Sequence, residues 1–181
     1  MLMVNGDYFR AIRGVAESVQ FQDVVSVTPD QAEKQRHMEL AVRFLVHSFV
    51  PYDGKLDVEE YIDEGTIRLA RGGDEQASVN LINKTFGLLH SAFGPDALRR
   101  YENGTHSGRV GLVALEAIAV GIARNVDAIL ALGDGDAAAF VKDRIEAFWS
   151  QPTVANFTSP GLRGTARIQR TVPFGTEWFK P

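Results

Sequence analysis

The stretch that decides the fold is Gly111-Leu-Val-Ala-Leu-Glu-Ala-Ile-Ala-Val-Gly-Ile-Ala123, which carries one charged residue, Glu116. A helix that is apolar on nearly every side lies inside a bundle rather than on its surface. We therefore predict a helix over 107–125 and expect it to be the central one. The apolar run is shorter than the roughly 20 residues that cross a bilayer.

Helical spacing of apolar residues extends to both sides of this stretch. Thr28-Pro29-Asp30-Gln31 is typical of a helix start, because it offers a hydroxyl cap, a proline at the first helical position and a Gln for the capping box. We expect that helix to end near Phe49. Other helices are predicted over 7–19, 57–69, 74–93 and 95–101, and from Asp134 or Asp136 past Trp149.

Two short β-favouring patches, Val24 to Val27 and Ile168 to Val172, are too isolated to support a sheet. The fold prediction is an all-α, single-domain helical bundle of about seven to nine helices over residues 1–181. Glycines and prolines interrupt residues 152–181, so we expect a less regular basic and aromatic tail there.

Composition excludes several classes of protein. The 181 residues contain no cysteine and carry a formal charge of −4. Disulfide frameworks and cysteine-ligated metal sites are therefore excluded. The negative net charge argues against a protein whose whole surface binds nucleic acid. The first residues do not form the apolar centre of a signal peptide, so we expect a cytoplasmic protein with no membrane partner.

No motif for catalysis, metal binding or cofactor binding stands out, and we expect no catalytic residue, metal or cofactor. Asp134-Gly135-Asp136 begins like a calcium loop, but Ala138 and Ile145 occupy positions that need oxygen ligands. The histidines lack metal-ligand spacing. They are expected at surface or boundary positions: His37, His47, His90 and His106. An acidic cluster is expected to be a solvated helix face: Glu59, Glu60, Asp63 and Glu64.

Two charged residues lie where burial would be costly. Glu116 is in the central helix, and Arg43 is in Leu40-Ala-Val-Arg-Phe-Leu-Val46. A buried charge needs a partner. We predict that the two helices cross and that Arg43 pairs with Glu116, while Glu39 supports Arg43 from one turn earlier. The alternative is that Glu116 acts as a general base.

The end of the chain differs in charge from the rest. Residues 152–181 contain four Lys or Arg and one acidic residue, a net +3, whereas residues 1–151 have a net −7. In a helix opened by Ser159-Pro160, Arg163, Arg167 and Arg170 would share one face. That face would meet phosphates or an acidic partner, or it would dock on the protein's own acidic body. The final aromatic residues, Trp178 and Phe179 among them, either pack on the bundle or form an interaction surface.

The order of several motifs resembles the helical part of the GmrSD-type restriction endonuclease N-terminal family, over about residues 5–172. Relatives have a stretch of the kind Glu-Leu-x-x-Arg-Phe-Leu, then a Tyr with small residues, a Phe-Gly-x-x-Ala turn and an apolar helix with an internal acid. The matching segments are Asn5-Gly-Asp-Tyr-Phe9, His37-Met-Glu-Leu-Ala-Val-Arg-Phe-Leu45, Pro51-Tyr-Asp-Gly54, Phe93-Gly-Pro-Asp-Ala97 and Ala114-Leu-Glu-Ala-Ile118.

Full-length members of that family begin with a ParB-like domain, whose Asp-Gly-Gln-Gln-Arg motif is linked to nucleotide hydrolysis, and many end with a His-containing nuclease domain. Neither motif occurs in this chain. The resemblance therefore implies a helical companion module of an anti-phage or modification-dependent restriction system, beside a ParB-like catalytic subunit or domain. Homo-oligomerisation is left open.

Three hypotheses about function follow. The first is a non-catalytic scaffold or regulatory module. The second is a DNA-contacting module that uses the basic C-terminal helix. The third is an enzyme with a site around Glu116.

Overall fold

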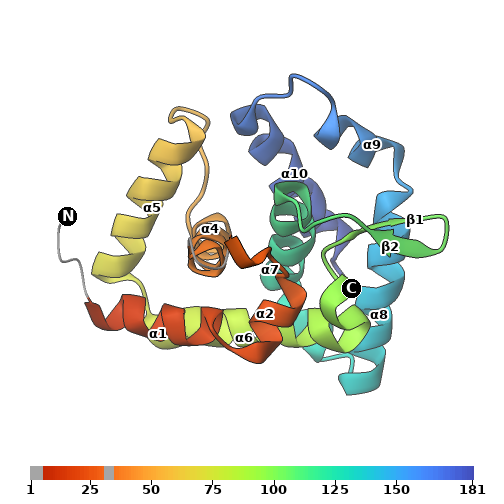
Figure 1. The fold of residues 1–181 in the computed structure, drawn as a ribbon, viewed down its shortest axis with the longest axis horizontal. Helices are drawn as coiled ribbons and strands as arrows, with labels where there is room; N and C mark the ends of the chain where they lie inside the picture. Colours follow the sequence, from red (N-terminus) through yellow and green to blue (C-terminus); the bar gives the residue numbers. More distant parts are fainter. Residues whose placement is uncertain (1–5, 31–34) are drawn as a thin grey trace.

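The computed structural model describes residues 6–30 and 35–181. Nine α-helices, one π-helix and one short hairpin form the described part, which confirms the all-α prediction (Figure 1). In chain order the helices are α1 (Gly6–Ala16), α2 (Val19–Val24), α4 (Arg36–Phe49), α5 (Val58–Gly72), α6 (Glu75–Phe93), η2 (Ala114–Ala119), α7 (Val120–Leu130), α8 (Asp134–Trp149), α9 (Pro152–Ala155) and α10 (Gly164–Trp178).

The apolar stretch is central, as predicted. Its π-helix η2 continues directly into α7, and every residue of η2 is buried. The pair η2 and α7 packs against α4, α6 and α10. The helix starts later than expected, because residue 107 ends a β-strand and Gly108 turns the chain with a φ of 77°. Among the described residues, no helix combines the length and apolarity that crossing a membrane requires.

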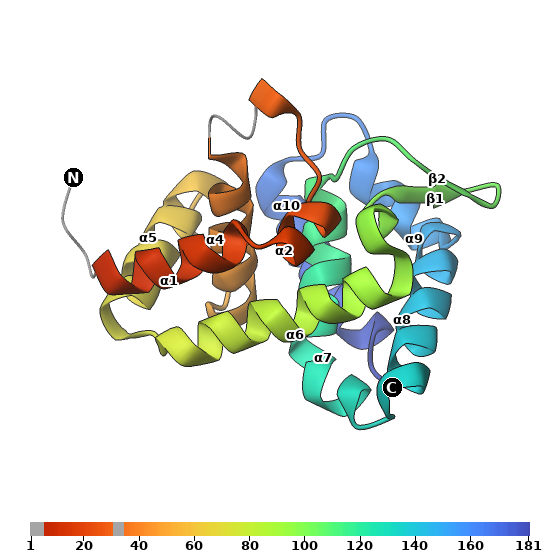
Figure 2. The same cartoon turned by 60° about the horizontal axis from the view of Figure 1, so that its bottom comes forward.

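The long helix α6 crosses the molecule beneath α1, α2 and α4 (Figure 2). Phe86 of α6 lies between Phe21 of α2 and Phe44 of α4, with ring centroids 4.5 and 5.2 Å apart, respectively. All three rings are fully buried. Residues far apart in the sequence therefore share one core.

Aspartate side chains cap the starts of α5 and α6, whereas α8 begins after Gly133 without a side-chain cap. Asp57 accepts a hydrogen bond from the backbone N–H of Glu60, whose side chain returns a bond to the Asp57 N–H. Asp74 caps α6 by accepting from Ala77. These local side chain to backbone bonds satisfy donors that the first helical turn leaves unpaired.

The region from Thr28 to Phe49 is less continuous than predicted. Pro29 and Asp30 are helical and Gln31 lies outside the described residues. The helix α4 begins at Arg36, after Gln35 with a left-handed φ of 58°. The Val24 to Val27 patch is also not a strand, because α2 runs to Val24.

The predicted helix over 95–101 is wrong. A 3₁₀ turn, η1 (Gly94–Asp96), leads into strand β1 (Arg100–Glu102), which pairs antiparallel with β2 (Thr105–Ser107). Asn103 and Gly104 connect the strands with φ values of 53° and 79°. An Asn-Gly pair favours such tight hairpins, because both residues tolerate positive φ.

The C-terminal tail is regular, contrary to expectation. Helix α10 passes through Pro173 and Gly175, so Ile168 to Val172 is not a strand. A Cβ atom at Gly175 would collide with the carbonyl of Ala117, and one at Gly121 would collide with the carbonyl of Gly175. These two glycines therefore let α10 and the central helix touch backbone to backbone, and this packing outweighs their low helix propensity.

Candidate functional site

Glu116 is held by two residues of α10. The Arg167 Nη2 donates to Oε1 over 2.9 Å, and Nε donates to Oε2 over 3.0 Å. The Thr171 hydroxyl adds a hydrogen bond of 2.8 Å to Oε2. The side chain of Glu116 is 2% exposed and that of Arg167 is 19% exposed. A bidentate, largely desolvated pair of this kind is strong and orients both partners.

The predicted Arg43–Glu116 pair is wrong, although both residues are buried as expected. Arg43 instead donates through Nε to Glu39 over 3.0 Å and through Nη2 to Glu59 over 2.7 Å. Glu39 does support Arg43 from one turn earlier. Glu116 pairs with Arg167 rather than with Arg43 because α10 packs against the central helix and brings Arg167 to it.

The Arg43 cluster lies nearer to water. The side chains of Glu39 and Glu59 are 43% and 74% exposed. Burial acts to lower the pKa of Arg43, but hydrogen bonds to Glu59 and Glu39 raise it above its usual value. Burial acts to raise the pKa of Glu39, and hydrogen bonds from Arg36 and Arg43 lower it. Glu59 is thus exposed, as expected for the acidic cluster, but engaged.

His47 is buried, which corrects its expected surface or boundary position. Its ring is 2% exposed, and Nδ1 has no hydrogen-bond partner in the described part of the chain. Burial is the main cause that lowers the pKa of His47 to about 3, and nearby positive charges reinforce it. Those charges belong to Arg43, Arg167 and Arg124. The imidazole is therefore neutral at physiological pH.

The cavity beside His47 has a volume of about 290 Å³, just below the usual range of small-molecule sites, which begins at about 300 Å³. Tyr61 and Arg124 line it together with the outer side of α10. Burial raises the pKa of Tyr61 to about 12, and its hydroxyl donates to the Val50 carbonyl over 2.7 Å. Arg124 donates to the His47 carbonyl over 2.9 Å. Both side chains are used to join helices.

The predicted arginine stripe is divided by the structure. Arg163 is the residue that precedes α10, and it is exposed, as is Arg170. Arg167 turns inward to Glu116. The prediction that the stripe docks on the protein's own acidic groups is therefore correct for Arg167. Neither Arg163 nor Arg170 forms an ion pair with any described residue.

The aromatic tail packs on the bundle. Phe179 is fully buried, so its expected role in partner contact is wrong. Trp178 is partly buried, and its Nε1 donates to the Arg144 carbonyl of α8 over 3.0 Å. Its ring stacks on Phe174 at 5.8 Å and lies 5.4 Å from the Arg144 guanidinium. The helical course of α10 turns this aromatic face toward α8.

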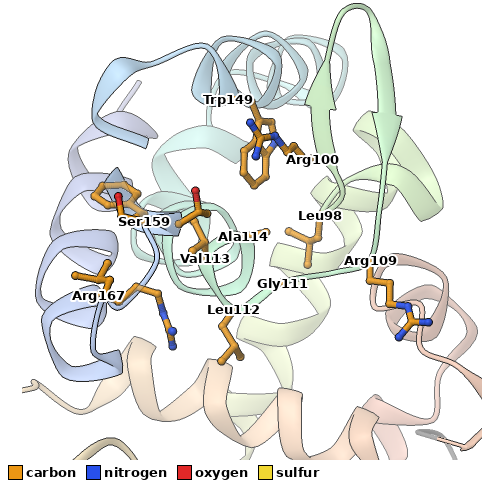
Figure 3. A pocket seen from close by; sticks show the side chains of 13 residues that line it. Leu98, Arg100, Arg109, Gly111, Leu112, Val113, Ala114, Trp149, Ser159 and Arg167 are labelled. Atoms are coloured by element: carbon orange, nitrogen blue, oxygen red, sulfur yellow. The ribbon is translucent and has the colours of Figure 1, made fainter. Parts of the chain in front are cut away.

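A larger cavity, of about 450 Å³, lies between the hairpin, the start of the central apolar stretch at 111–114, the end of α8, residues 156–162 and α10 (Figure 3). Trp149 hangs into it from α8, beside Arg100 of β1. Arg109 and Arg167 line its edges. The Nε1 of Trp149 has no hydrogen-bond partner in the described residues. No periodicity in the sequence indicates this cavity, because it depends on how several separate segments meet.

The buried charge of Glu116 joins the central helix to α10. Glu116 accepts hydrogen bonds from both Arg167 and Thr171. In residues 6–30 and 35–181, no group of three or more His, Asp or Glu side chains is placed to hold a metal ion.

Comparison with known proteins adds no assignment. No family model, curated protein or solved structure matches this chain.

Proposed function

We propose that this chain is a non-catalytic helical module that supports or regulates a separate catalytic partner. The observation that carries the proposal is the use made of Glu116, the one charged residue of the central apolar helix. Its carboxylate is engaged by Arg167 and Thr171 in the interior. A carboxylate held in this way is poorly placed to act as a general base, because both of its oxygens already accept hydrogen bonds from α10 in the interior.

The motif order resembles the helical part of the GmrSD-type family, and this resemblance indicates the kind of partner. We propose a ParB-like catalytic subunit or domain in a restriction or anti-phage system. The exposed Arg163 and Arg170, one before and one within α10, are the proposed contacts. An arginine without an ion pair inside the chain can bind an acidic face of a partner, and no existing ion pair has to be broken for this.

Reconstitution tests the proposal. A purified ParB-like domain that carries Asp-Gly-Gln-Gln-Arg is assayed for nucleotide hydrolysis with and without an equimolar amount of this chain. We expect no hydrolysis by the chain alone and a change of about threefold or more in the partner's rate. The variant Arg163→Ala/Arg170→Ala should lose the effect, whereas Arg68→Ala/Arg71→Ala on α5 should keep it.

Two outcomes contradict the proposal. One is that the partner's rate of nucleotide hydrolysis stays unchanged at a saturating concentration of this chain. The other is hydrolysis or DNA cleavage by the chain alone that disappears in a folded Glu116→Gln variant, which would favour an enzyme site around Glu116.

DNA contact is the second candidate function, because Arg163 and Arg170 are also suited to backbone phosphates. Fluorescence anisotropy of a labelled duplex at several salt concentrations tests it. Binding to phosphates should weaken steeply as salt rises, and loss of each contacting arginine should lower the slope of log K against log salt by about 1. Binding that does not depend on salt would contradict this candidate.

A further inference from the structure

The larger cavity combines an apolar interior with positively charged edges. Besides Trp149, six apolar residues line it, and no carboxylate does. They are Leu98, Leu112, Val113, Ala114, Phe157 and Leu162. The volume of about 450 Å³ is within the usual range of small-molecule sites. The lining therefore favours a ligand with an apolar body and an anionic head.

Two of the three lining arginines already have a carboxylate nearby. Arg167 is paired with Glu116, and Arg100 lies 3.4 Å from Glu102 in the same strand. Arg109 forms no ion pair with any described residue. The edge of the cavity thus carries one uncompensated positive charge, which matches a monoanion better than a dianion.

The position of Trp149 indicates where the apolar body would lie. Its ring enters the cavity beside the Arg100 side chain, while Arg109 points outward at the opposite edge (Figure 3). Phe157 lines the same cavity. Aromatic rings pack favourably on other rings and on the stems of arginines. A guanidinium group next to the aromatic ring of a ligand can pair with a carboxylate that the same ligand carries.

We propose that this cavity binds a small organic carboxylate with an aromatic body, seated against Trp149 with its carboxylate at Arg100 and Arg109. The ion pair with Glu116 fixes the position of Arg167 at the edge of the site. Arg109 swings inward to reach the carboxylate. This site goes beyond the proposed scaffold function, because it uses neither Arg163 nor Arg170.

The test uses 3-phenylpropanoate and the full chain. The variant Trp178→Phe leaves Trp149 as the single tryptophan, so its fluorescence reports the cavity. We expect a saturable change in Trp149 emission with a dissociation constant of about 1 mM or lower. The neutral 3-phenylpropan-1-ol and the short anion acetate should each bind at least tenfold more weakly.

Two sets of variants locate the interaction. Arg100→Ala/Arg109→Ala should weaken 3-phenylpropanoate binding at least tenfold, and Arg100→Lys/Arg109→Lys should restore part of it. The control Arg68→Ala/Arg71→Ala, with the same loss of charge on α5, should bind like the parent. Leu162→Asp places a negative charge at the apolar lining and should also abolish binding, so the proposal stays testable if the double alanine variant fails to fold.

Equal binding of the alcohol and the acid would overturn the proposal. So would binding that is unchanged in Arg100→Ala/Arg109→Ala, or a fluorescence change that saturates equally in Leu162→Asp. Circular dichroism of each variant confirms the folded state before titration.

Discussion

Glu116 and Arg43 are both charged residues in otherwise apolar helical segments, but the structure accommodates them differently. The partners of Glu116, Arg167 and Thr171, come from α10, 51 and 55 residues further along the chain. Arg43 is paired within α4 and with Glu59 of α5, whose side chain is mostly in water. The first cluster is desolvated and depends on the tertiary fold. In the second cluster Arg43 is also buried, but it has two carboxylates, and both of them reach water.

This difference has an energetic consequence. Removing one partner of a buried ion pair leaves an uncompensated charge in a medium that solvates it poorly. Removing one partner of an exposed pair allows water to replace it. We therefore expect similar substitutions in the two clusters to have unequal effects on stability.

The largest effect is expected where α10 meets the central helix. Gly175→Val should lower the free energy of unfolding by about 4 kcal/mol or more, because the side chain would collide with the Ala117 backbone and separate Arg167 from Glu116. Urea unfolding followed by circular dichroism measures this. As a control, Gly14→Ala on α1, where a Cβ meets no atom within 4 Å, should be neutral or stabilising. Similar stability of Gly175→Val and the parent would contradict the close helix contact.

Breaking the Glu116 pair itself should be the next largest effect. Glu116→Leu should cost about 3 kcal/mol, since Arg167 would lose its carboxylate while its side chain is 19% exposed. The double variant Glu116→Leu/Arg167→Met should regain most of that loss, because both charges are then absent. Chemical unfolding of the single and double variants provides the measurement. If the double variant is less stable than Glu116→Leu, the unpaired charge of Arg167 is not the cause of the stability lost in Glu116→Leu.

Acidification should destabilise the interior between the two clusters. The pKa of His47 is about 3 in the folded protein and close to 6.5 when unfolded. Between these values the unfolded chain binds a proton that the folded chain does not, so stability falls as pH falls below 6.5. From pH 7 to pH 5 we expect a loss of about 2 kcal/mol from this group. His47→Gln should remove that part of the pH dependence, and an unchanged slope would contradict the buried, neutral histidine.

The smallest effect is expected in the Arg43 cluster. Glu59→Gln should lower the free energy of unfolding by less than about 1 kcal/mol, because the Glu59 side chain is 74% exposed and Arg43 keeps its ion pair with Glu39. Thermal unfolding in low and high salt is the appropriate measurement, since added salt should shrink the difference further. A loss as large as that of Glu116→Leu would remove the distinction between the clusters.

Much of the helical organisation follows from local patterns. Asp57 and Asp74 act through backbone groups three residues away, and the apolar character of 111–123 requires burial wherever the other helices lie. The need of Arg43 and Glu116 for partners also follows from burial. The choice of partner does not, because several charged residues have the right chemistry and only the packing brings one of them close.

The missed features have particular causes. A short helix is predicted over 95–101, but the adjoining Asn103-Gly104 pair favours a hairpin, and the hairpin forms. Pro173 and Gly175 predict a broken tail when only local propensity is considered, yet Gly175 is the residue that lets α10 approach Ala117. Spacing along the chain does not reveal the burial of His47, because it results from the meeting of several helices.

By itself, the sequence determined an all-α bundle, its central apolar helix, the places where α5 and α6 begin, and the burial of two opposite charges. These properties depend on hydrogen bonds and periodicities within a few turns of helix. Only the tertiary structure decided that Glu116 pairs with Arg167, that Phe179 is interior, and that Trp149 and Arg100 share a cavity. Those outcomes depend on contacts between residues far apart in the chain, and the positions of whole helices select them.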